Sequence, residues 1–243
     1  KDPVRVIKLD KDMTLTEPIM VEKLGKNVVL DLNGHKIEGD FLCEGLCIVD
    51  NGAGLTIKDS SSLGTGKIIS KGTKAVSSLA CVKNGSLTVN GGTFENEKYD
   101  ALWLMDNRGG KLTVNGGYIK SKRRRAVVAQ KGSNLTINGG TMTSVRIDKP
   151  SVELEYAKAV INGGKIIGED GNGVRCCSAV VYVNGGDIAG NRALMLYDKS
   201  KAIVSGGHFT GMWYSVFVGK DADAKLVAGK FEVPAGEKAI AVR

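Results

Sequence analysis

The chain of 243 residues is 42% hydrophobic and only 5% aromatic, and its formal net charge is +8. With 33 glycines but only 4 prolines it cannot be collagen-like, because a collagen helix needs glycine at every third position and abundant proline. No apolar run is long enough to cross a membrane as a helix, so we expect a soluble chain that does not insert into membranes. The positive charge either favours anionic partners or reflects only a solvated surface.

The N-terminal segment, residues 1–27, matches none of the units that follow it, and its residues 4–9 can serve as a cap. A stack of parallel strands has unpaired edges at its ends, and repeat proteins protect such ends with atypical terminal segments. We therefore predict that residues 1–27 form a capping segment and that residues 28–243 form one repetitive domain.

A pattern of the type Leu-Thr-Val-Asn-Gly-Gly recurs through that domain at intervals of about 23 residues. An early variant occupies residues 29–37, and a second begins at residues 55–58 and is followed by an insertion at 59–66. Clear copies begin at Leu87, Leu112 and Leu135, and looser copies centre on Asn162, Asn184, Ser205 and Ala228.

Each unit predicts three short strands. Apolar and polar residues alternate before the asparagine, which is typical of a half-buried strand. Asn-Gly-Gly then turns the chain, since asparagine and glycine accept positive φ angles. A second strand with one large apolar residue and a third apolar strand complete the unit, so we predict an all-β, three-sided parallel β-helix of about nine coils, each of roughly 23 residues.

The Leu-Thr-Val-Asn-Gly-Gly units and the opening Val-Leu-Asp-Leu-Asn-Gly-His-Lys-Ile resemble the right-handed parallel β-helix proteins of the pectate-lyase-like group. They are most similar to its non-enzymatic members, such as phage fibre or head-decoration proteins and bacterial adhesin-like surface proteins. The resemblance implies a right-handed solenoid, a structural or adhesive role, and a location on a virion or a bacterial cell surface. The same fold carries many functions, so the resemblance is specific for fold alone.

Equivalent positions of successive coils stack in columns, and one column contains only asparagine. Its side-chain amides are expected to bond from coil to coil and to stabilise the turns rather than to bind a ligand. This predicted structural ladder consists of Asn90, Asn115, Asn138, Asn162 and Asn184.

The third strand is predicted to be apolar on both faces. Counting ten residues back from each asparagine places Trp103 inward and several large apolar residues outward. An exposed apolar strip of this kind marks an interface, unless loops of the same chain cover it. We expect self-association, for example a trimer, or docking on a larger assembly, through Leu79, Leu104, Val127, Leu194, Leu196 and Phe217.

A dense basic run lies on the loop between a second and a third strand, and an aromatic pair occupies the equivalent region four coils later. These residues either form solvated loops or bind an acidic glycan or another anion, without sequence-specific recognition of nucleic acid. The predicted anion-binding residues are Lys120, Lys122, Arg123, Arg124, Arg125, Trp213 and Tyr214.

An enzymatic alternative, a polysaccharide lyase or glycoside hydrolase for acidic polysaccharide, would centre on Asp106, Glu153 and Arg175 near Arg125. Asp106 and Glu153 are expected in one column two coils apart, about 9–10 Å, which is a separation suited to an inverting glycosidase. A stacked surface ion pair of Glu153 with Arg175 is the competing interpretation, and we favour a non-enzymatic protein.

No cofactor or metal site is expected from the motifs. Five cysteines, an odd number without a Cys-x-x-Cys pair, predict buried thiols in a chain synthesised in a reducing compartment. The two histidines, His35 and His208, have no partner by spacing and are expected to be incidental.

Overall fold

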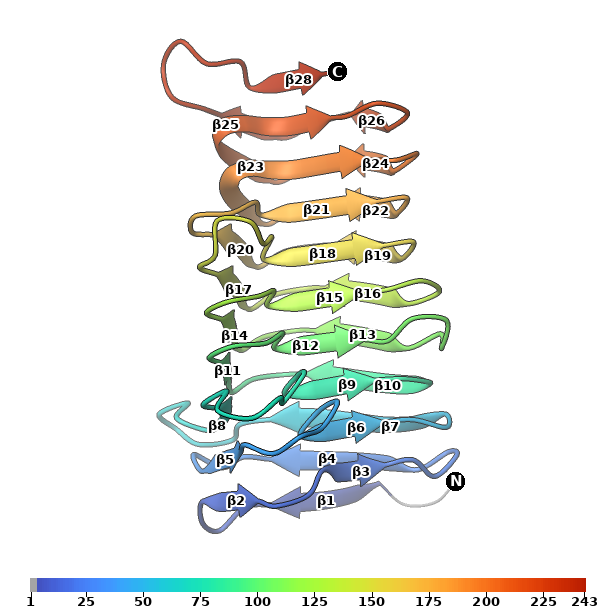
Figure 1. Ribbon diagram of the computed structural model, residues 1–243, viewed down its shortest axis with the longest axis vertical. Helices are drawn as coiled ribbons and strands as arrows, with labels where there is room; N and C mark the ends of the chain where they lie inside the picture. The colour runs from blue at the N-terminus through green and yellow to red at the C-terminus, as the bar shows by residue number, and fades with distance from the viewer. Residues whose placement is uncertain (1–3) are drawn as a thin grey trace.

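The computed structural model describes residues 4–243 as a stack of parallel strands wound into a solenoid (Figure 1). Its first face is a sheet of ten strands, one from each turn, so the solenoid has about ten turns of roughly 24 residues. No helix occurs among residues 4–243. The predicted all-β parallel β-helix is therefore confirmed.

Three strands from each turn form three faces, which we number in chain order. The first face contains β1 (Arg5–Lys8), β4 (Asn27–Asp31), β7 (Ala53–Lys58), β10 (Gly85–Val89), β13 (Lys111–Val114), β16 (Asn134–Ile137), β19 (Lys158–Ile161), β22 (Val180–Val183), β24 (Lys201–Val204) and β26 (Asp223–Leu226).

The second face contains β2 (Met13–Leu15), β5 (Lys36–Gly39), β8 (Lys67–Ser70), β11 (Thr93–Asn96), β14 (Tyr118–Ser121), β17 (Thr141–Ser144), β20 (Lys165–Gly168) and β27 (Lys230–Glu232). The third face contains β3 (Ile19–Val21), β6 (Cys47–Val49), β9 (Ala80–Val82), β12 (Leu102–Leu104), β15 (Val127–Ala129), β18 (Val152–Glu155), β21 (Val174–Cys177) and β28 (Ile240–Val242).

Two strands of eleven residues, β23 (Asp187–Tyr197) and β25 (His208–Val218), contribute to both the second and the third face. In most other coils a loop separates these two faces. The long strands instead turn the corner directly, and the backbone register shifts between Gly190 and Arg192 where β23 pairs with β25.

The first coil is more regular than the sequence suggests. Strands β1, β2 and β3 pair in register with β4, β5 and β6. Residues 4–21 of the expected capping segment therefore contribute a coil of their own, which raises the count from about nine to about ten. Residues 1–3 of that segment lie outside the described part of the chain.

Because inward apolar and outward polar side chains alternate along the strands, one continuous apolar core lies inside the solenoid. Leu87, Leu112 and Leu135 stack on the first face and are at most 1% exposed. The large apolar residues of the second strand, including Phe94 and Phe209, form another fully buried column, as predicted. Burial of these side chains is the main driving force for folding.

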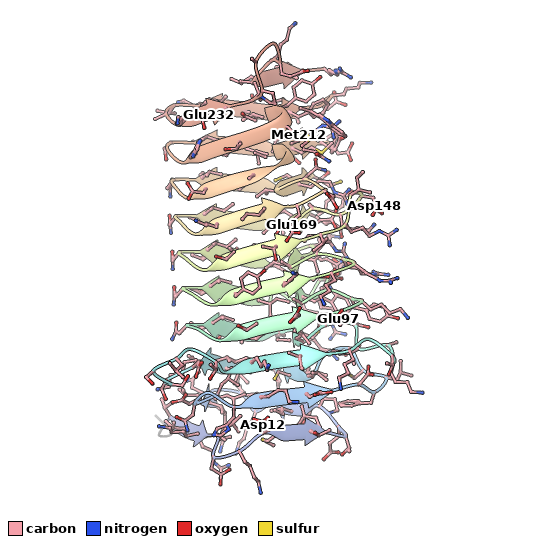
Figure 2. The ribbon with its side chains drawn as sticks, turned by 90° about the vertical axis from the view of Figure 1, so that its left-hand side faces the viewer. Asp12, Glu97, Asp148, Glu169, Met212 and Glu232 are labelled. Carbon is pink, nitrogen blue, oxygen red and sulfur yellow. The ribbon has the colours of Figure 1, made fainter. Side chains whose placement is uncertain are left out.

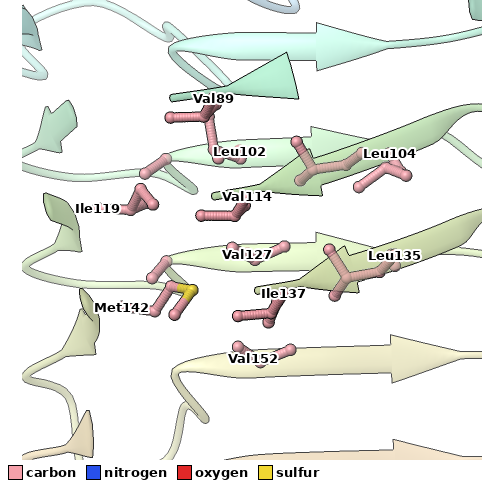
Figure 3. Close-up of a cluster of buried hydrophobic side chains, with 14 of the residues drawn as sticks. Val89, Leu102, Leu104, Val114, Ile119, Val127, Leu135, Ile137, Met142 and Val152 are labelled. Carbon is pink, nitrogen blue, oxygen red and sulfur yellow. The ribbon is translucent and has the colours of Figure 1, made fainter. Parts of the chain in front are cut away.

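The predicted register of the third strand is wrong in the coils of Leu104, Val127 and Leu194, whereas Val152 and Val174 point inward as predicted. Pairing places Leu102, Val127, Val152 and Val174 in one inward column, and Leu104 with Ala129 in the next. Figure 3 shows Leu104 and Val127 within the core. Five of the six residues assigned to an outward strip thus belong to the core and are fully buried within one chain: Leu79, Leu104, Val127, Leu194 and Leu196.

Phe217 does face outward, but side chains of the same protein cover it. Its ring lies 5.8 Å from the ring centroids of Tyr197 and Tyr214, with Arg192 above it, and it is 7% exposed. The expectation of self-association rested on an exposed strip of these residues and loses that basis.

The asparagine ladder is confirmed. From Asn115 to Asn184, each side-chain amide donates a hydrogen bond of 2.8 Å to the Oδ1 atom of the asparagine one coil earlier. The ladder is exposed, and Ser205 extends it by one coil. The second glycine of each turn has φ near +90°, and a Cβ atom at Gly140 would lie 2.9 Å from the Gly117 carbonyl oxygen.

Replacing Asn138 by alanine is expected to destabilise the protein by about 1–2 kcal/mol, because Asn138 both donates and accepts a ladder bond. Asn90 accepts a single ladder bond, so Asn90→Ala should cost about half as much. Urea denaturation followed by circular dichroism measures both values. Equal stability of Asn138→Ala and the wild type would contradict a stabilising role for the ladder.

The cysteines are all free, and Cys47, Cys81 and Cys176 are buried. Burial raises the pKa of Cys47 to about 12, which keeps the thiol neutral. Three of the five cysteines thus match the predicted buried thiols, whereas Cys43 and Cys177 are partly exposed. The redox compartment stays a prediction.

Candidate functional site

The loops between the second and third faces are held by a buried polar column at the end of the second strand. Ser121 donates a 2.7 Å hydrogen bond to the carbonyl oxygen of Tyr99, and Ser144 donates one of 2.6 Å to that of Arg124. Asn96, which is fully buried, donates to the carbonyl oxygen of Asp100 at 3.0 Å. The two serine bonds each fix a loop against the coil that follows it, and the asparagine bond closes a loop within its own coil.

The predicted basic run divides into residues with different partners. Lys120 lies on β14, and Lys122 pairs with Glu97 at 2.6 Å and Glu95 at 3.6 Å. Arg123 and Arg124 are exposed, and neither has a carboxylate within 4 Å among residues 4–243. These two guanidinium groups are therefore available to an external anion.

Arg125 turns inward and is not part of that exposed pair. Its Nη2 atom lies 2.8 Å from Asp100 Oδ2, and its Nη1 atom lies 2.5 Å from Glu153 Oε2. Burial disfavours the charged guanidinium, but the hydrogen bonds to Asp100 and Glu153 outweigh it and raise the pKa of Arg125 further. The prediction that Arg125 contacts a ligand's anionic group is not supported by this geometry.

Glu153 is the centre of the charge network. Its side chain is only 2% exposed and also accepts hydrogen bonds from Arg175 on the next coil, with 2.7 Å between Arg175 Nε and Glu153 Oε1. The predicted stacking of Glu153 on Arg175 is confirmed by their pairing in β18 and β21, but the expected surface position is wrong for Glu153, which is buried. Both carboxylate oxygens are thus held by guanidinium groups.

Of the three residues in the predicted catalytic set, Glu153 and Arg175 are in contact but Asp106 is not in their column. Asp106 follows β12 in an exposed turn, whereas Glu153 stacks in the column of Trp103 and Val128. The column shared by Asp106 and Glu153 was therefore wrong, for the same reason as the third-strand register. The separation of 9–10 Å expected for a shared column therefore has no basis for Asp106 and Glu153.

A small cleft, which we call the Tyr99–Trp103 cleft, opens beside this network. It has a volume of about 210 Å³, and Arg124, Arg125 and Gln130 also line it. The Trp103 indole donates a 2.8 Å hydrogen bond to Gln130 Oε1, and Gln130 in turn donates to Glu155 at 3.0 Å. Trp103 therefore faces outward, and its predicted inward orientation is wrong.

Two cationic side chains lie near the Tyr99 ring at the rim of the cleft. Lys98 Nζ and the Arg124 guanidinium carbon each lie 5.5 Å from the ring centroid. Cation–π contacts of this length hold long side chains in place. The rim thus presents positive charge in an ordered arrangement beside an aromatic wall.

Trp213 and Tyr214 lie far from the basic loop. They belong to β25, four coil steps from β15, which corresponds to about 19 Å along the solenoid. Trp213 is 44% exposed, and the guanidinium of Arg192 lies 4.8 Å from its ring centroid. The structure therefore does not unite the two halves of the predicted anion-binding set.

Sequence reasoning missed Tyr99, Asp100 and Gln130. Tyr99 and Asp100 are neighbours in one loop, whereas Gln130 follows the third strand of the next coil. They belong to no common motif, so only a correct alignment of the coils would have placed Gln130 beside the other two. The one available signal was the position of Tyr99 in the loop that precedes the basic run by one coil.

Comparison of the chain with protein-family models, curated proteins and solved structures finds no match. No helix among residues 4–243 is long and apolar enough to span a membrane. Within the same residues, no group of three or more His, Cys, Asp and Glu side chains is placed to hold a metal ion.

Proposed function

We propose that this protein is a non-enzymatic β-solenoid that binds an acidic glycan at the Tyr99–Trp103 cleft. The observation that carries the proposal is the combination of two aromatic side chains with the unpaired guanidinium of Arg124 at one small cleft. The arrangement sits on rigid strands and on loops fixed by buried hydrogen bonds.

The chemistry of the cleft fits a carboxylated sugar. A pyranose ring presents C–H groups on its face, which pack on aromatic rings, and its carboxylate can pair with a guanidinium through two parallel hydrogen bonds. The volume of about 210 Å³ lies below the range of pockets for drug-sized ligands and suits a single ring. Arg123 and Lys98 add positive charge for the neighbouring sugars of a chain.

The enzymatic alternative is less favoured by the geometry. A glycosidase needs a pair of carboxyl groups that face the scissile bond, one of them as an acid. Glu153 is occupied by Arg125 and Arg175, and Asp106 lies in another part of the surface. We also keep the prediction that the protein has a structural or adhesive role at a virion or bacterial cell surface, where it docks on a larger assembly. Such a role is compatible with a glycan-binding module.

Isothermal titration calorimetry with galacturonic acid oligomers tests the proposal. Arg124→Gln should weaken binding at least about tenfold, since it removes a charge-assisted pair. Lys158→Gln is the matched control, because Lys158 is an exposed cation on the first face. The proposal would be refuted if Arg124→Gln and Lys158→Gln bound galacturonic acid oligomers with equal affinity. It would also be refuted if the wild type bound neutral galactose oligomers as tightly as galacturonic acid oligomers.

The same oligomers separate binding from catalysis. After prolonged incubation with the wild type, their chain length should be unchanged by mass spectrometry. Release of shorter products that is lost in Glu153→Ala would favour the lyase or hydrolase alternative instead.

A further inference from the structure

A second hollow lies on the C-terminal coils, where β23 and β25 pass from the second to the third face without a loop. The coil before them carries the connection 169–173, and the coil after them carries 233–239. Both connections project beside the long strands, and the groove between them has a volume of about 800 Å³. Figure 2 looks onto this side of the solenoid and labels Glu169, Met212 and Glu232. We call the hollow the C-terminal groove.

The body of the groove is apolar. Its floor follows the outward column Ile167, Ala189 and Thr210, which ends at Glu232 three coil steps later, or about 14 Å. Met212 lines the groove and is 62% exposed as a residue. Phe231 also lines it and stacks on Phe209, with 5.1 Å between the ring centroids. An exposed thioether beside partly exposed apolar side chains is a surface suited to an apolar ligand.

The polar groups that line the groove are mainly acceptors. Glu169 is exposed, and its carboxylate has no ion pair or hydrogen bond within residues 4–243. Asn191 is 8% exposed; its amide nitrogen donates to the Asp170 carbonyl oxygen at 2.6 Å, while its Oδ1 atom accepts no hydrogen bond from the described residues. No lysine or arginine is among the lining residues.

Unlike Glu169, the Glu232 carboxylate has partners for both of its oxygens. His208 lies 2.5 Å from its Oε2 atom, and Lys230 lies 2.5 Å from its Oε1 atom. Hydrogen bonds from Lys230 and then from His208 lower the pKa of Glu232, so it stays a carboxylate. The charge in need of a partner is therefore at the Glu169 end of the groove.

We propose that the C-terminal groove binds a short apolar peptide segment that carries an arginine. The aliphatic neighbours of the arginine would pack on Met212 and Ile167, and the guanidinium would donate to Glu169 and to Asn191 Oδ1. We choose arginine because of charge complementarity. The Glu169 carboxylate and Asn191 Oδ1 accept hydrogen bonds, and Glu169 would repel an anionic ligand. The groove is separate from the Tyr99–Trp103 cleft, and the proposal does not depend on the glycan.

Fluorescence anisotropy with three labelled peptides tests the proposal: acetyl-Leu-Arg-Leu amide, its citrulline analogue and its glutamate analogue. Citrulline keeps the shape of arginine without its charge. The arginine peptide should bind at least about tenfold more tightly than the citrulline peptide, and the glutamate peptide should not bind.

Variants locate the binding. Glu169→Gln should abolish the preference for arginine over citrulline, and Met212→Ser should weaken both peptides. Asp223→Asn is the control, because it removes the same charge as Glu169→Gln. Asp223 is an exposed carboxylate of β26 on the first face, away from the groove. The proposal is overturned if Asp223→Asn and Glu169→Gln weaken the arginine peptide equally, or if the wild type binds arginine and citrulline peptides alike. Circular dichroism confirms that each variant is folded.

Discussion

Replacement of Glu153 by alanine is expected to lower the free energy of unfolding by about 3 kcal/mol. The substitution leaves the partly buried Arg125 with Asp100 alone, and within residues 4–243 it leaves Arg175 without a carboxylate. Removal of one member of a buried ion pair costs several kcal/mol. The loss should appear as a lower urea midpoint with an unchanged slope.

Asp106→Ala is the matched control for Glu153→Ala. Asp106 is exposed, and its side chain has no ion pair within residues 4–243, so its loss should change stability by less than about 0.5 kcal/mol. If the two variants were equally stable, Glu153 would not be a structural member of the network. A stable, fully folded Glu153→Ala would reopen a catalytic interpretation of that carboxylate.

Leu104→Asp should prevent folding at ordinary temperature. Leu104 is fully buried in the core, and an aspartate there would place an unpaired carboxyl group in an apolar interior, at a cost of at least about 4 kcal/mol. Leu104→Ala gives a graded version, with an expected loss of about 2–5 kcal/mol from the cavity alone. Far-ultraviolet circular dichroism and thermal denaturation report the outcome.

Thr113→Asp introduces the same residue on the outer side of the first face, where Thr113 is partly exposed. The expected cost is about 1 kcal/mol, from the lower strand propensity of aspartate. If Leu104→Asp were as stable as Thr113→Asp, the third strand would have the opposite register, and Leu104 would face outward.

The fold was predictable because two strong local signals repeat together. The alternation before each asparagine fixes which residues point inward, and the ladder asparagine with its two glycines fixes where the chain turns. Both signals lie within a few residues of one another, so variation elsewhere in the coil does not disturb them. The core residues of the first two faces, such as Leu87 and Phe94, follow directly.

The third face was misaligned because the connection before the next first-face strand varies in length. The stacked residues Leu104, Ala129 and Leu154 lie eleven, nine and eight residues before their ladder asparagines, so a fixed offset of ten changes the face from coil to coil. A shift of one residue reverses the orientation of every side chain in a strand. The same slip placed Trp103 in the core.

The candidate sites were only partly predictable. A charge run such as 120–125 reveals a basic loop, but it cannot show that Arg125 turns toward Asp100 and Glu153 while Arg124 stays exposed. The C-terminal groove forms where β23 and β25 run from the second to the third face without an intervening loop. The lack of a loop has no sequence motif by which it could be recognised.

Tryptophan fluorescence tests the proposed glycan site most directly, because the chain has two tryptophans and only Trp103 lines the cleft. In the Trp213→Phe variant, where Trp103 is the single emitter, galacturonic acid oligomers should shift or quench the emission, and Arg124→Gln should remove that response. An emission change that occurs only in Trp103→Phe, and so arises from Trp213, would place the glycan elsewhere and contradict the account.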